Sequence, residues 1–207
     1  GIVRAHPIAE ALSAALRDSP VRPALLERLL VAREADLDDA PPPALAAMEE
    51  YAAGTSGVLQ QAALDVLGVS GEAADRAASS VGIAWALLGL LRAVPFHARR
   101  RRLLLPADLL AREGVEPDSL FEGRPGPGLQ AVVKAVAARA EEYLDAARAL
   151  KGEISRAALP VLLPAMLAGI HRRRLAAARF DVFAPDLSQP IAFDALRLAF
   201  SGWRGRY

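Results

Sequence analysis

Apolar residues recur at helical spacing in the first part of the chain. In residues 2–17 they follow one another at intervals of three and four, and Pro7 suits a first helical turn. Residues 21–35 carry four leucines in the same kind of pattern, with arginine and glutamate between them. The sequence therefore predicts two short amphipathic helices.

Longer segments with the same period follow. Residues 44–67 and 129–150 each predict one long helix with an apolar stripe, and residues 73–91 predict a central helix that is apolar on nearly every side. Glycines in the middle of a helix lower its stability. Gly54 and Gly57 in the first of these segments therefore predict the close approach of another helix or of a ligand.

The rest of the chain alternates between helices and connections. Residues 107–111 predict a short helix, residues 114–128 a loop rich in glycine and proline, and residues 155–179 a helix kinked by its prolines. A final helix is predicted over residues 191–200. Neither a strand pattern nor a repeat of 20–50 residues is visible. The predicted fold class is all-α, in a single domain of residues 1–207.

The stretch 81–106 is the most distinctive in the chain. Its nearly uncharged run is predicted to break at Pro95, and four consecutive arginines, Arg99 to Arg102, then lead to Pro106. An apolar helix that brings a cationic loop to one end of a cavity could hold a greasy molecule with an anionic head, because guanidinium groups fit phosphate oxygens. The alternative, which is the commoner use of a charge run, is a buried helix followed by a solvated basic turn.

Composition and charge narrow the function classes. The 25 Lys and Arg residues against 24 Asp and Glu residues leave a net charge of +1, so no overall field recruits nucleic acid. The absence of cysteine excludes disulfide scaffolding, thiolate catalysis and cysteine-ligated metal sites. The three histidines are far apart in sequence and indicate no metal site. The longest apolar runs, 81–91 and 157–170, are shorter than the roughly 20 residues of a membrane span, and are predicted to be core helices. No signal or transit peptide is recognised at the start.

Three smaller features of the sequence have both a functional and a structural explanation. Asp36, Asp38 and Asp39 could bind a divalent cation, but an acidic N-terminus for the next helix explains them better. The cluster Arg172–Arg174 is explained by its place near a helix C-terminus, or alternatively as a surface for anionic lipid or an acidic partner. Trp85 is expected to pack in the core, as a lone aromatic residue on an apolar helix usually does.

Seven residues of the stretch 81–106 fit the pattern of a known family signature. They are Gly82, Ala84, Arg92, Ala98, Arg102, Leu105 and Pro106. The stretch resembles the second signature of the squalene/phytoene synthase family, in which an Ala-x-Gln-x-x-Asn-x-x-Arg-Asp helix leads into acidic residues and a Leu-Pro close. The resemblance implies a terpenoid synthase-like helical bundle, of which further N-terminal helices would precede Gly1.

The positions that carry the family's chemistry differ in this chain. Ala93 and His97 stand where active members have metal-binding aspartates, and Phe96 stands at a glutamate position. The glutamine and asparagine positions hold Ala86 and Gly89. Magnesium requires oxygen ligands, which neither alanine nor imidazole supplies. The resemblance therefore implies that the metal site has been lost.

Several blocks resemble a non-catalytic branch of the family, that of the mitochondrial complex I assembly factor 6 and its bacterial relatives. These blocks are Leu91 to His97, Leu105 to Leu109, Gly114 with Val115, Phe180 to Phe183, and Trp203 to Tyr207. The resemblance implies a pseudoenzyme without a cofactor that helps assemble respiratory complex I. Its partners would be complex I subunits or assembly intermediates, with peripheral contact to the inner face of the bacterial plasma membrane or the matrix side of the mitochondrial inner membrane.

A residual pocket for an isoprenoid or anionic lipid is a further expectation. Its residues would be Tyr51, Trp85, Arg92, His97, Arg99 and Arg102. The rival interpretation is an active prenyltransferase that condenses isoprenoid diphosphates, with magnesium held by segments upstream of Gly1. Released diphosphate from an incubation with farnesyl diphosphate and magnesium would distinguish the two.

Overall fold

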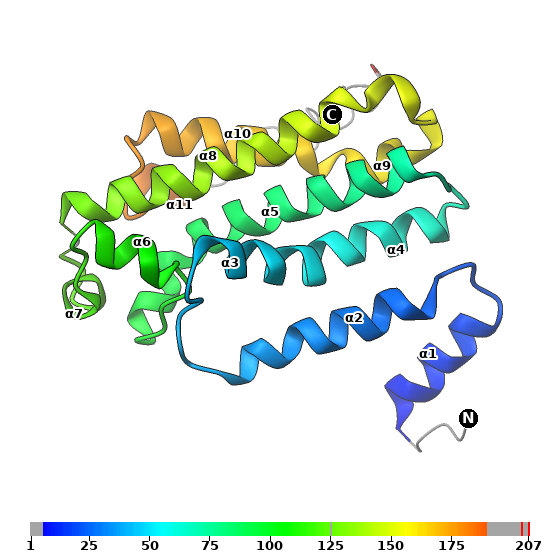
Figure 1. Ribbon diagram of the computed structural model, residues 1–207, viewed down its shortest axis with the longest axis horizontal. Helices are drawn as coiled ribbons and strands as arrows, with labels where there is room; N and C mark the ends of the chain where they lie inside the picture. Colours follow the sequence, from blue (N-terminus) through cyan, green and yellow to red (C-terminus); the bar gives the residue numbers. More distant parts are fainter. Residues whose placement is uncertain (1–5, 125, 190–203, 205–206) are drawn as a thin grey trace.

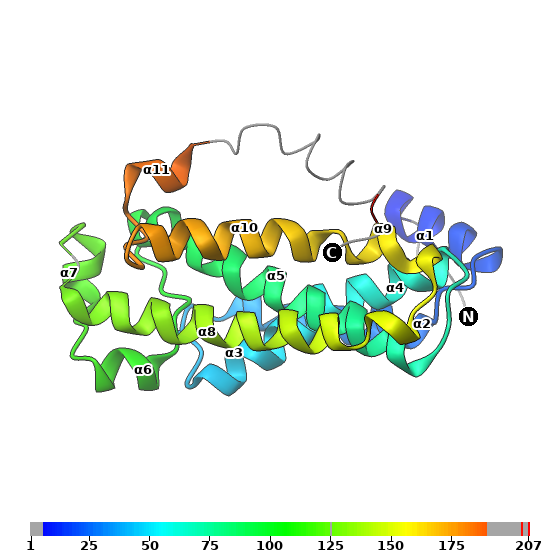
Figure 2. The same cartoon turned by 90° about the horizontal axis from the view of Figure 1, so that it is seen from above.

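The chain folds around one long helix, α5 (Glu72–Arg99). The structure is a computed structural model that describes residues 6–124, 126–189, 204 and 207. Helices α3 (Leu45–Ala52), α4 (Val58–Val66), α8 (Pro127–Ala149) and α10 (Pro164–Ala177) all pack against α5. Figures 1 and 2 show these helices running alongside one another, with α5 in the middle of the bundle.

The amino acids of α5 explain its central place. Twelve of its residues are buried, and they lie on several sides of the helix instead of one stripe. A helix that is apolar all round is stable only inside other helices. Glu72 and Asp75 in its first turn and His97 and Arg99 in its last turn complement the helix dipole.

The remaining helices cover the ends and one side of the bundle. Helices α1 (Pro7–Arg17) and α2 (Pro23–Arg33) come first, and α2 packs on α4 through a small cluster of Leu25, Val58 and Ala62. Short helices α6, α7 and α9 connect the larger ones, and α11 follows α10. Their bounds are Ala107–Arg112, Pro117–Phe121, Leu159–Leu162 and Pro185–Ser188.

The glycines of the segment 44–67 lie where helices cross. Residues Ala53–Gly57 form a π-helical turn, η2, between α3 and α4. A Cβ atom on Gly54 would meet Cβ of Ala32 at 2.7 Å, and one on Gly82 of α5 would meet Cα of Gly57 at 2.7 Å. The predicted close approach is confirmed, and the neighbours are the helices α2 and α5.

Helix α5 does not end at Pro95, so the break expected there is wrong. Pro95 lies inside the helix, where it removes one backbone hydrogen bond at a cost of about 3 kcal/mol. The last turns nevertheless bury Val94 and Ala98 in the core, and the N–H groups of Arg100 and Arg102 both donate to the carbonyl oxygen of His97. The burial of residues on both sides of the proline and the hydrogen bonds that close the helix after it offset the cost of the proline.

Two other expected elements are also corrected, and a third is not tested. The loop expected over residues 114–128 contains α7, which begins at Pro117 with Asp118 in its first turn. The kinked helix expected over 155–179 consists of separate pieces, a 3-10 turn, α9 and α10, because Pro160 and Pro164 each begin a new turn. The helix expected over 191–200 lies outside the described residues.

The acidic stretch 36–39 does not form the start of the next helix, as the sequence had suggested. Helix α3 begins at Leu45 with Ala44 as its N-cap, and its first turn holds no acid. The three prolines at 41–43 keep the chain extended between the acids and the helix. The acids lie instead at a 3-10 turn, η1 (Glu34–Leu37), and just after it.

Helix α5 is also long and apolar enough to cross a membrane by length and composition, alone among the helices of residues 6–189. However, 56% of its most apolar window is buried inside the bundle. The core helix of a soluble protein passes the same test, and the packing of α5 accounts for its apolar character. Burial, more than length, supports the prediction that this stretch is a core helix.

Candidate ligand cavity and the positions of the metal ligands

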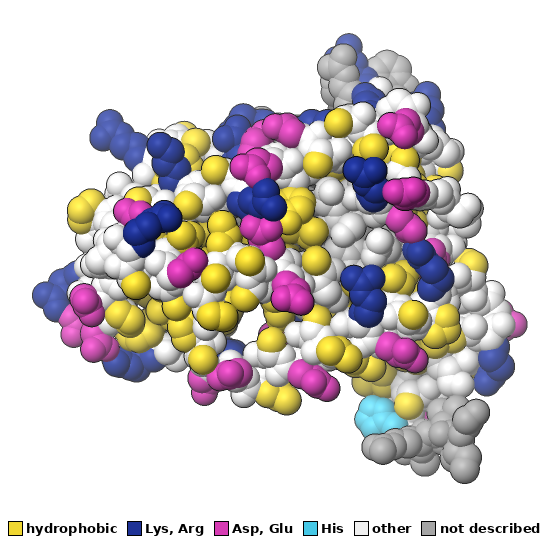
Figure 3. All heavy atoms as spheres, in the orientation of Figure 1, with side chains coloured by type: hydrophobic (Ala, Val, Ile, Leu, Met, Phe, Trp, Pro, Cys, Tyr) yellow, Lys and Arg dark blue, Asp and Glu magenta, His cyan; other side chains and the backbone are white. Residues whose placement is uncertain are grey.

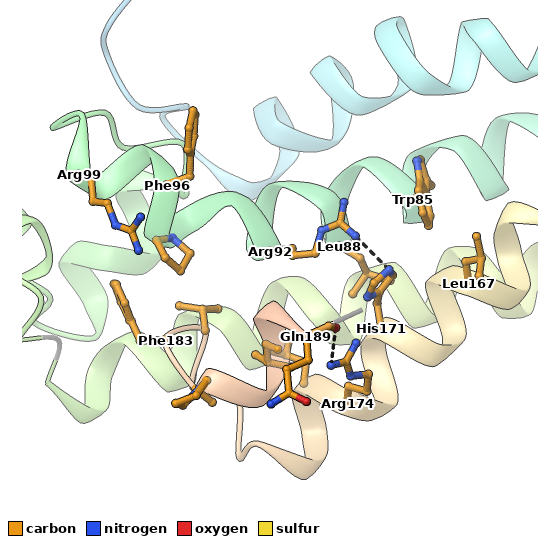
Figure 4. A pocket seen from close by; sticks show the side chains of 16 residues that line it. Trp85, Leu88, Arg92, Phe96, Arg99, Leu167, His171, Arg174, Phe183 and Gln189 are labelled. Atoms are coloured by element: carbon orange, nitrogen blue, oxygen red, sulfur yellow. Dashed lines mark hydrogen bonds between the residues drawn. The ribbon is translucent and has the colours of Figure 1, made fainter. Parts of the chain in front are cut away.

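A cavity of about 670 Å³ lies between α5, α10 and the segment that leads into α11 (Figure 4). Its walls are mostly apolar. They include Trp85, Leu88, Leu167, Leu175, Phe183 and Leu187. Ligand pockets in proteins measure about 300–1,000 Å³ and combine such walls with a few polar groups. The size and lining are those of a small-molecule site.

The polar groups of the cavity are cationic. Arg92 and Arg99 reach it from α5, and His171 and Arg174 from α10, while no Asp or Glu is among its described lining residues. The Nη1 group of Arg92 lies 3.1 Å from Nε2 of His171. Because a guanidinium only donates, this imidazole nitrogen acts as the acceptor.

Arg174 also holds the wall of the cavity in place. Its Nη2 group donates to the backbone carbonyl oxygens of Asp186 and Gln189, the latter at 3.0 Å. These bonds fasten the α11 segment over α10, and Figure 4 shows Gln189 close to Arg174 on the side of the cavity away from α5. Carbonyl oxygens accept hydrogen bonds without neutralising the guanidinium charge.

Of the six residues predicted to form a residual pocket, the structure brings three together here. Trp85, Arg92 and Arg99 line the cavity. Trp85 is half-buried and packs on the core, as expected of it, and its ring centroid lies 5.9 Å from that of His171. The other three predicted residues, Tyr51, His97 and Arg102, do not line this cavity.

Two of these residues, Tyr51 and Arg102, lie around the acidic stretch instead. The hydroxyl of Tyr51 donates to Oδ1 of Asp36 at 2.7 Å. The Nη2 group of Arg102 donates to the carbonyl oxygens of Asp36 and Asp38, at 3.3 and 3.1 Å. Arg33 completes this acidic-turn network, with Nη1 at 3.0 Å from Asp36 and 2.9 Å from the Tyr51 oxygen.

The network shifts the acidity of its members. Burial raises the pKa of the Asp36 carboxyl, but hydrogen bonds from Tyr51 and Arg33 outweigh burial, so the pKa lies below its ordinary value. Burial, followed by the hydrogen bond to Asp36, raises the pKa of the Tyr51 hydroxyl. The carboxylate of Asp36 therefore has a structural role, since it binds Arg33 of α2 and Tyr51 of α3.

The family resemblance assigns His97 to one of the two positions where active members hold magnesium. Burial, and then the charges of Arg102 and Arg100, lower the pKa of its imidazole. Its Nδ1 atom is buried without a hydrogen-bond partner among the described residues. Ala93, at the other position, has no polar side chain. Two neighbouring guanidinium charges and the missing carboxylates do not fit a magnesium ion.

The four consecutive arginines have separate surroundings. Arg99 faces the cavity, and Arg100 stacks on the half-exposed ring of Phe96 with its Cζ atom 4.3 Å from the ring centroid. Arg101 pairs with Asp118 at 2.8 Å and stacks on Phe121. Together with Arg102, which is bound to the acidic stretch, they form no single cationic site.

The second basic cluster is divided in the same way. Arg172 forms an ion pair with Glu141 of α8, Arg173 is exposed, and Arg174 lines the cavity. Successive residues on a helix point about 100° apart, which separates their side chains. Of the surface expected for lipid or a partner, Arg173 alone is exposed.

A further polar network, which the sequence did not predict, joins α3 and α8. Arg139 donates through Nε to Glu49 at 2.8 Å, and the hydroxyl of Tyr143 donates to the other oxygen of Glu49 at 2.7 Å. Arg139 and Tyr143 are spaced four apart on α8, a spacing that places them on one face. Their partner on another helix could not be found from that spacing.

Charges of both signs are interspersed over the face shown in Figure 3, with apolar side chains between them. This distribution agrees with the net charge of +1. The concentration of cations without acids in the cavity between α5 and α10 is therefore a local feature.

The comparisons with known proteins agree with this fold. The family model for squalene/phytoene synthase matches residues 1–204. The mouse protein named NADH dehydrogenase (ubiquinone) complex I, assembly factor 6, is 31% identical over 202 residues, which are 98% of this chain and 61% of the mouse protein. The chain thus spans about three fifths of the length of that relative.

Two solved structures share the fold. A crystal structure of a dehydrosqualene synthase with a ligand superposes with a TM-score of 0.77 at 22% identity, covering 98% of this chain and 71% of that one. The squalene synthase HpnC from Alicyclobacillus acidocaldarius gives 0.75 at 15% identity, covering 84% of this chain and 66% of that one. The terpenoid synthase-like fold inferred from the stretch 81–106 is confirmed, and the chain belongs to the squalene/phytoene synthase family.

Proposed function

We propose that this protein acts in the assembly of respiratory complex I and that it does not condense prenyl diphosphates. The support for assembly is its likeness, over nearly all of its length, to the mouse protein named as a complex I assembly factor. The support for inactivity is the environment of His97, where two guanidinium charges and a neutral imidazole replace acidic ligands. Ionisation of a diphosphate by metal needs the ligands that are missing there.

In this proposal the protein serves as a scaffold for a complex I subunit or an assembly intermediate. It works at the inner face of the energy-transducing membrane, which is the cytoplasmic face in a bacterium and the matrix face in a mitochondrion. The cavity between α5 and α10 gives the scaffold a place for an isoprenoid or an anionic lipid. No cofactor is part of the proposal.

Deletion of the gene, followed by complementation, tests the assembly role. The deletion strain is expected to lose assembled complex I on native gels and NADH:ubiquinone oxidoreductase activity, and to regain both with the wild-type gene. Succinate:ubiquinone oxidoreductase activity is the control, because it reports on the membrane without complex I. A deletion strain with normal complex I would contradict the proposal.

A separate assay tests inactivity. The purified full-length protein, incubated with farnesyl diphosphate and magnesium, is expected to release no diphosphate and to form no coupled hydrocarbon. A dehydrosqualene synthase assayed in parallel serves as the positive control. Turnover by the wild-type protein would favour the rival function, an active prenyltransferase.

A further inference from the structure

The cavity lies on a different side of α5 from the positions of the lost metal ligands. Leu88, Arg92 and Arg99 line it at intervals of four and seven residues, and therefore share one face. Ala93 and His97 do not line it, and the middle of their stripe is rotated from that face by about 140°. A ligand in the cavity would not occupy the metal site.

The cavity has an excess of positive charge. Three arginines line it, and its described lining contains no carboxylate. Arg92 contacts an imidazole, Arg174 contacts two carbonyl oxygens, and Arg99 forms no ion pair with a described residue. A bound anion would supply the charge that none of these partners provides.

The geometry favours a head group in the middle of the cavity. In Figure 4 the guanidinium groups of Arg92 and Arg174 lie on either side of His171. Trp85 and Leu167 lie toward one end of the view, and Phe183 toward the other. An anion held by the two arginines would therefore have apolar walls beside it for a hydrocarbon chain.

The number of arginines in the cavity favours a phosphate over a carboxylate as the head group. A carboxylate carries one negative charge, whereas a phosphate monoester carries about 1.5 to 2 at pH 7 and offers three acceptor oxygens. Three arginines match the phosphate better. The volume of about 670 Å³ suits one hydrocarbon chain beside that head.

We infer that the cavity between α5 and α10 binds a single-chain phosphate monoester, without a metal ion, through Arg92, Arg99 and Arg174. The inference deepens the proposed function, and rests on it only in that the ligand is held and not converted. The phosphate replaces the contact between Arg92 and His171, and the chain lies against Trp85, Leu88 and Leu167.

Calorimetric titration of the purified full-length protein with decyl phosphate in EDTA tests the inference. Decyl phosphate is expected to bind, and decanol and inorganic phosphate to bind at least about tenfold more weakly, because each lacks one half of the interaction. Equal binding of decanol would overturn the inference, since it would show an apolar cavity without a head-group site. A requirement for magnesium would also overturn it.

Matched variants assign the binding to this cavity. Arg92→Ala and Arg99→Ala are each expected to weaken binding by about tenfold, through the loss of a charge-assisted hydrogen bond. Arg173→Ala is the control, because Arg173 is exposed on α10 beside Arg174 but does not line the cavity. An equal effect of Arg173→Ala would indicate nonspecific attraction and overturn the assignment.

A further variant reduces the volume of the cavity and leaves its arginines unchanged. Ala184→Trp is expected to obstruct part of the cavity and weaken binding, with the helical circular dichroism of the protein unchanged. Undiminished binding by a folded Ala184→Trp protein would place the ligand elsewhere and overturn the inference.

Two sources could supply this chemistry, and the assay distinguishes them. If the ligand is a membrane lipid, vesicles containing the single-chain lipid lysophosphatidic acid will cosediment with the wild-type protein and not with Arg92→Ala. If the ligand is a free alkyl or prenyl phosphate, only the soluble compound will bind. Because titration needs no complex I, its result stands apart from the deletion experiment, and either proposal can fail alone.

Discussion

The crossing of α5 with the π-helical turn η2 makes a sharp prediction about stability. Substitution of Gly82 by alanine would place Cβ 2.5 Å from the carbonyl oxygen of Ser56 and 2.7 Å from both N and Cα of Gly57. Normal contact distances of 3.5–4.0 Å would require the two backbones to separate by about 1 Å. Both sides of the contact are backbone, so no side-chain rotation can relieve it.

The expected magnitude combines two opposing effects. Overpacking of a core costs typically 1–3 kcal/mol, and a contact between two backbones belongs at the upper end of that range. Alanine is favoured over glycine in a helix by about 1 kcal/mol. Gly82→Ala should therefore lower the free energy of unfolding by about 2 kcal/mol, which corresponds to a fall in Tm of about 4–8 °C for a chain of this size.

Gly89→Ala is the matched control in the same helix. A Cβ on Gly89 would meet nothing within 4 Å, so only the helix propensity changes. This variant should gain about 0.5–1 kcal/mol. Urea unfolding followed by circular dichroism measures both. A Gly82→Ala protein as stable as the wild type, or an equal loss in Gly89→Ala, would refute the reasoning about the crossing.

Three further predictions concern the polar networks. Tyr143→Phe removes the hydroxyl that donates to Glu49 at 2.7 Å and should lower the free energy of unfolding by about 1–2 kcal/mol in urea titrations, since Glu49 is mostly buried; an unchanged midpoint would contradict this. Arg22 reaches Asp65 and Asp75 from the start of α2, and Arg22→Ala should speed amide hydrogen exchange in α2 with a loss of only about 1 kcal/mol in global stability, because the pair is half-exposed. The folded pKa of Asp36 lies below its unfolded value of 3.8, so its stabilising contribution is present above that pH and is lost as the pH falls through the folded pKa. Stability measured from pH 6 to pH 2 should therefore fall less steeply in Asp36→Asn than in the wild type, and parallel curves would exclude this contribution.

Helix positions could be predicted from the sequence because their causes are local. The apolar period of residues 129–150 located α8 to within two residues at its start and one at its end. Gly54 and Gly57 indicated a close crossing, although the sequence could not name its partners. The helix break predicted at Pro95 was wrong, because the burial of Val94 and Ala98 depends on helices that are distant in sequence.

The candidate site was only partly predictable, for a different reason. Arg92, Arg99 and Trp85 could be placed in one pocket because they share a face of one helix. Tyr51, His97 and Arg102 were grouped with them from the family resemblance, but the structure surrounds Asp36 with Tyr51 and Arg102. The cations from α10 and the wall from α11 depend on tertiary packing, which no short stretch of sequence encodes.

The four arginines at the C-terminal end of α5 show how a run of like charges can be used without forming one site. Arg99 is the last residue of α5, and the backbone of Arg101 has a φ of 53°, so the chain turns sharply between them. The turn sends Arg101 toward the carboxylate of Asp118 and Arg102 toward that of Asp39 in the acidic stretch, and each arginine forms an ion pair there. Only Arg99 remains directed to the cavity, and it is Arg174, from a helix far along the chain, that adds the next charge there. Four consecutive arginines repel one another, and here they have separate partners, so they do not form an anion site by themselves. We therefore expect the anion-binding capacity of the cavity to depend on the packing of α10 on α5.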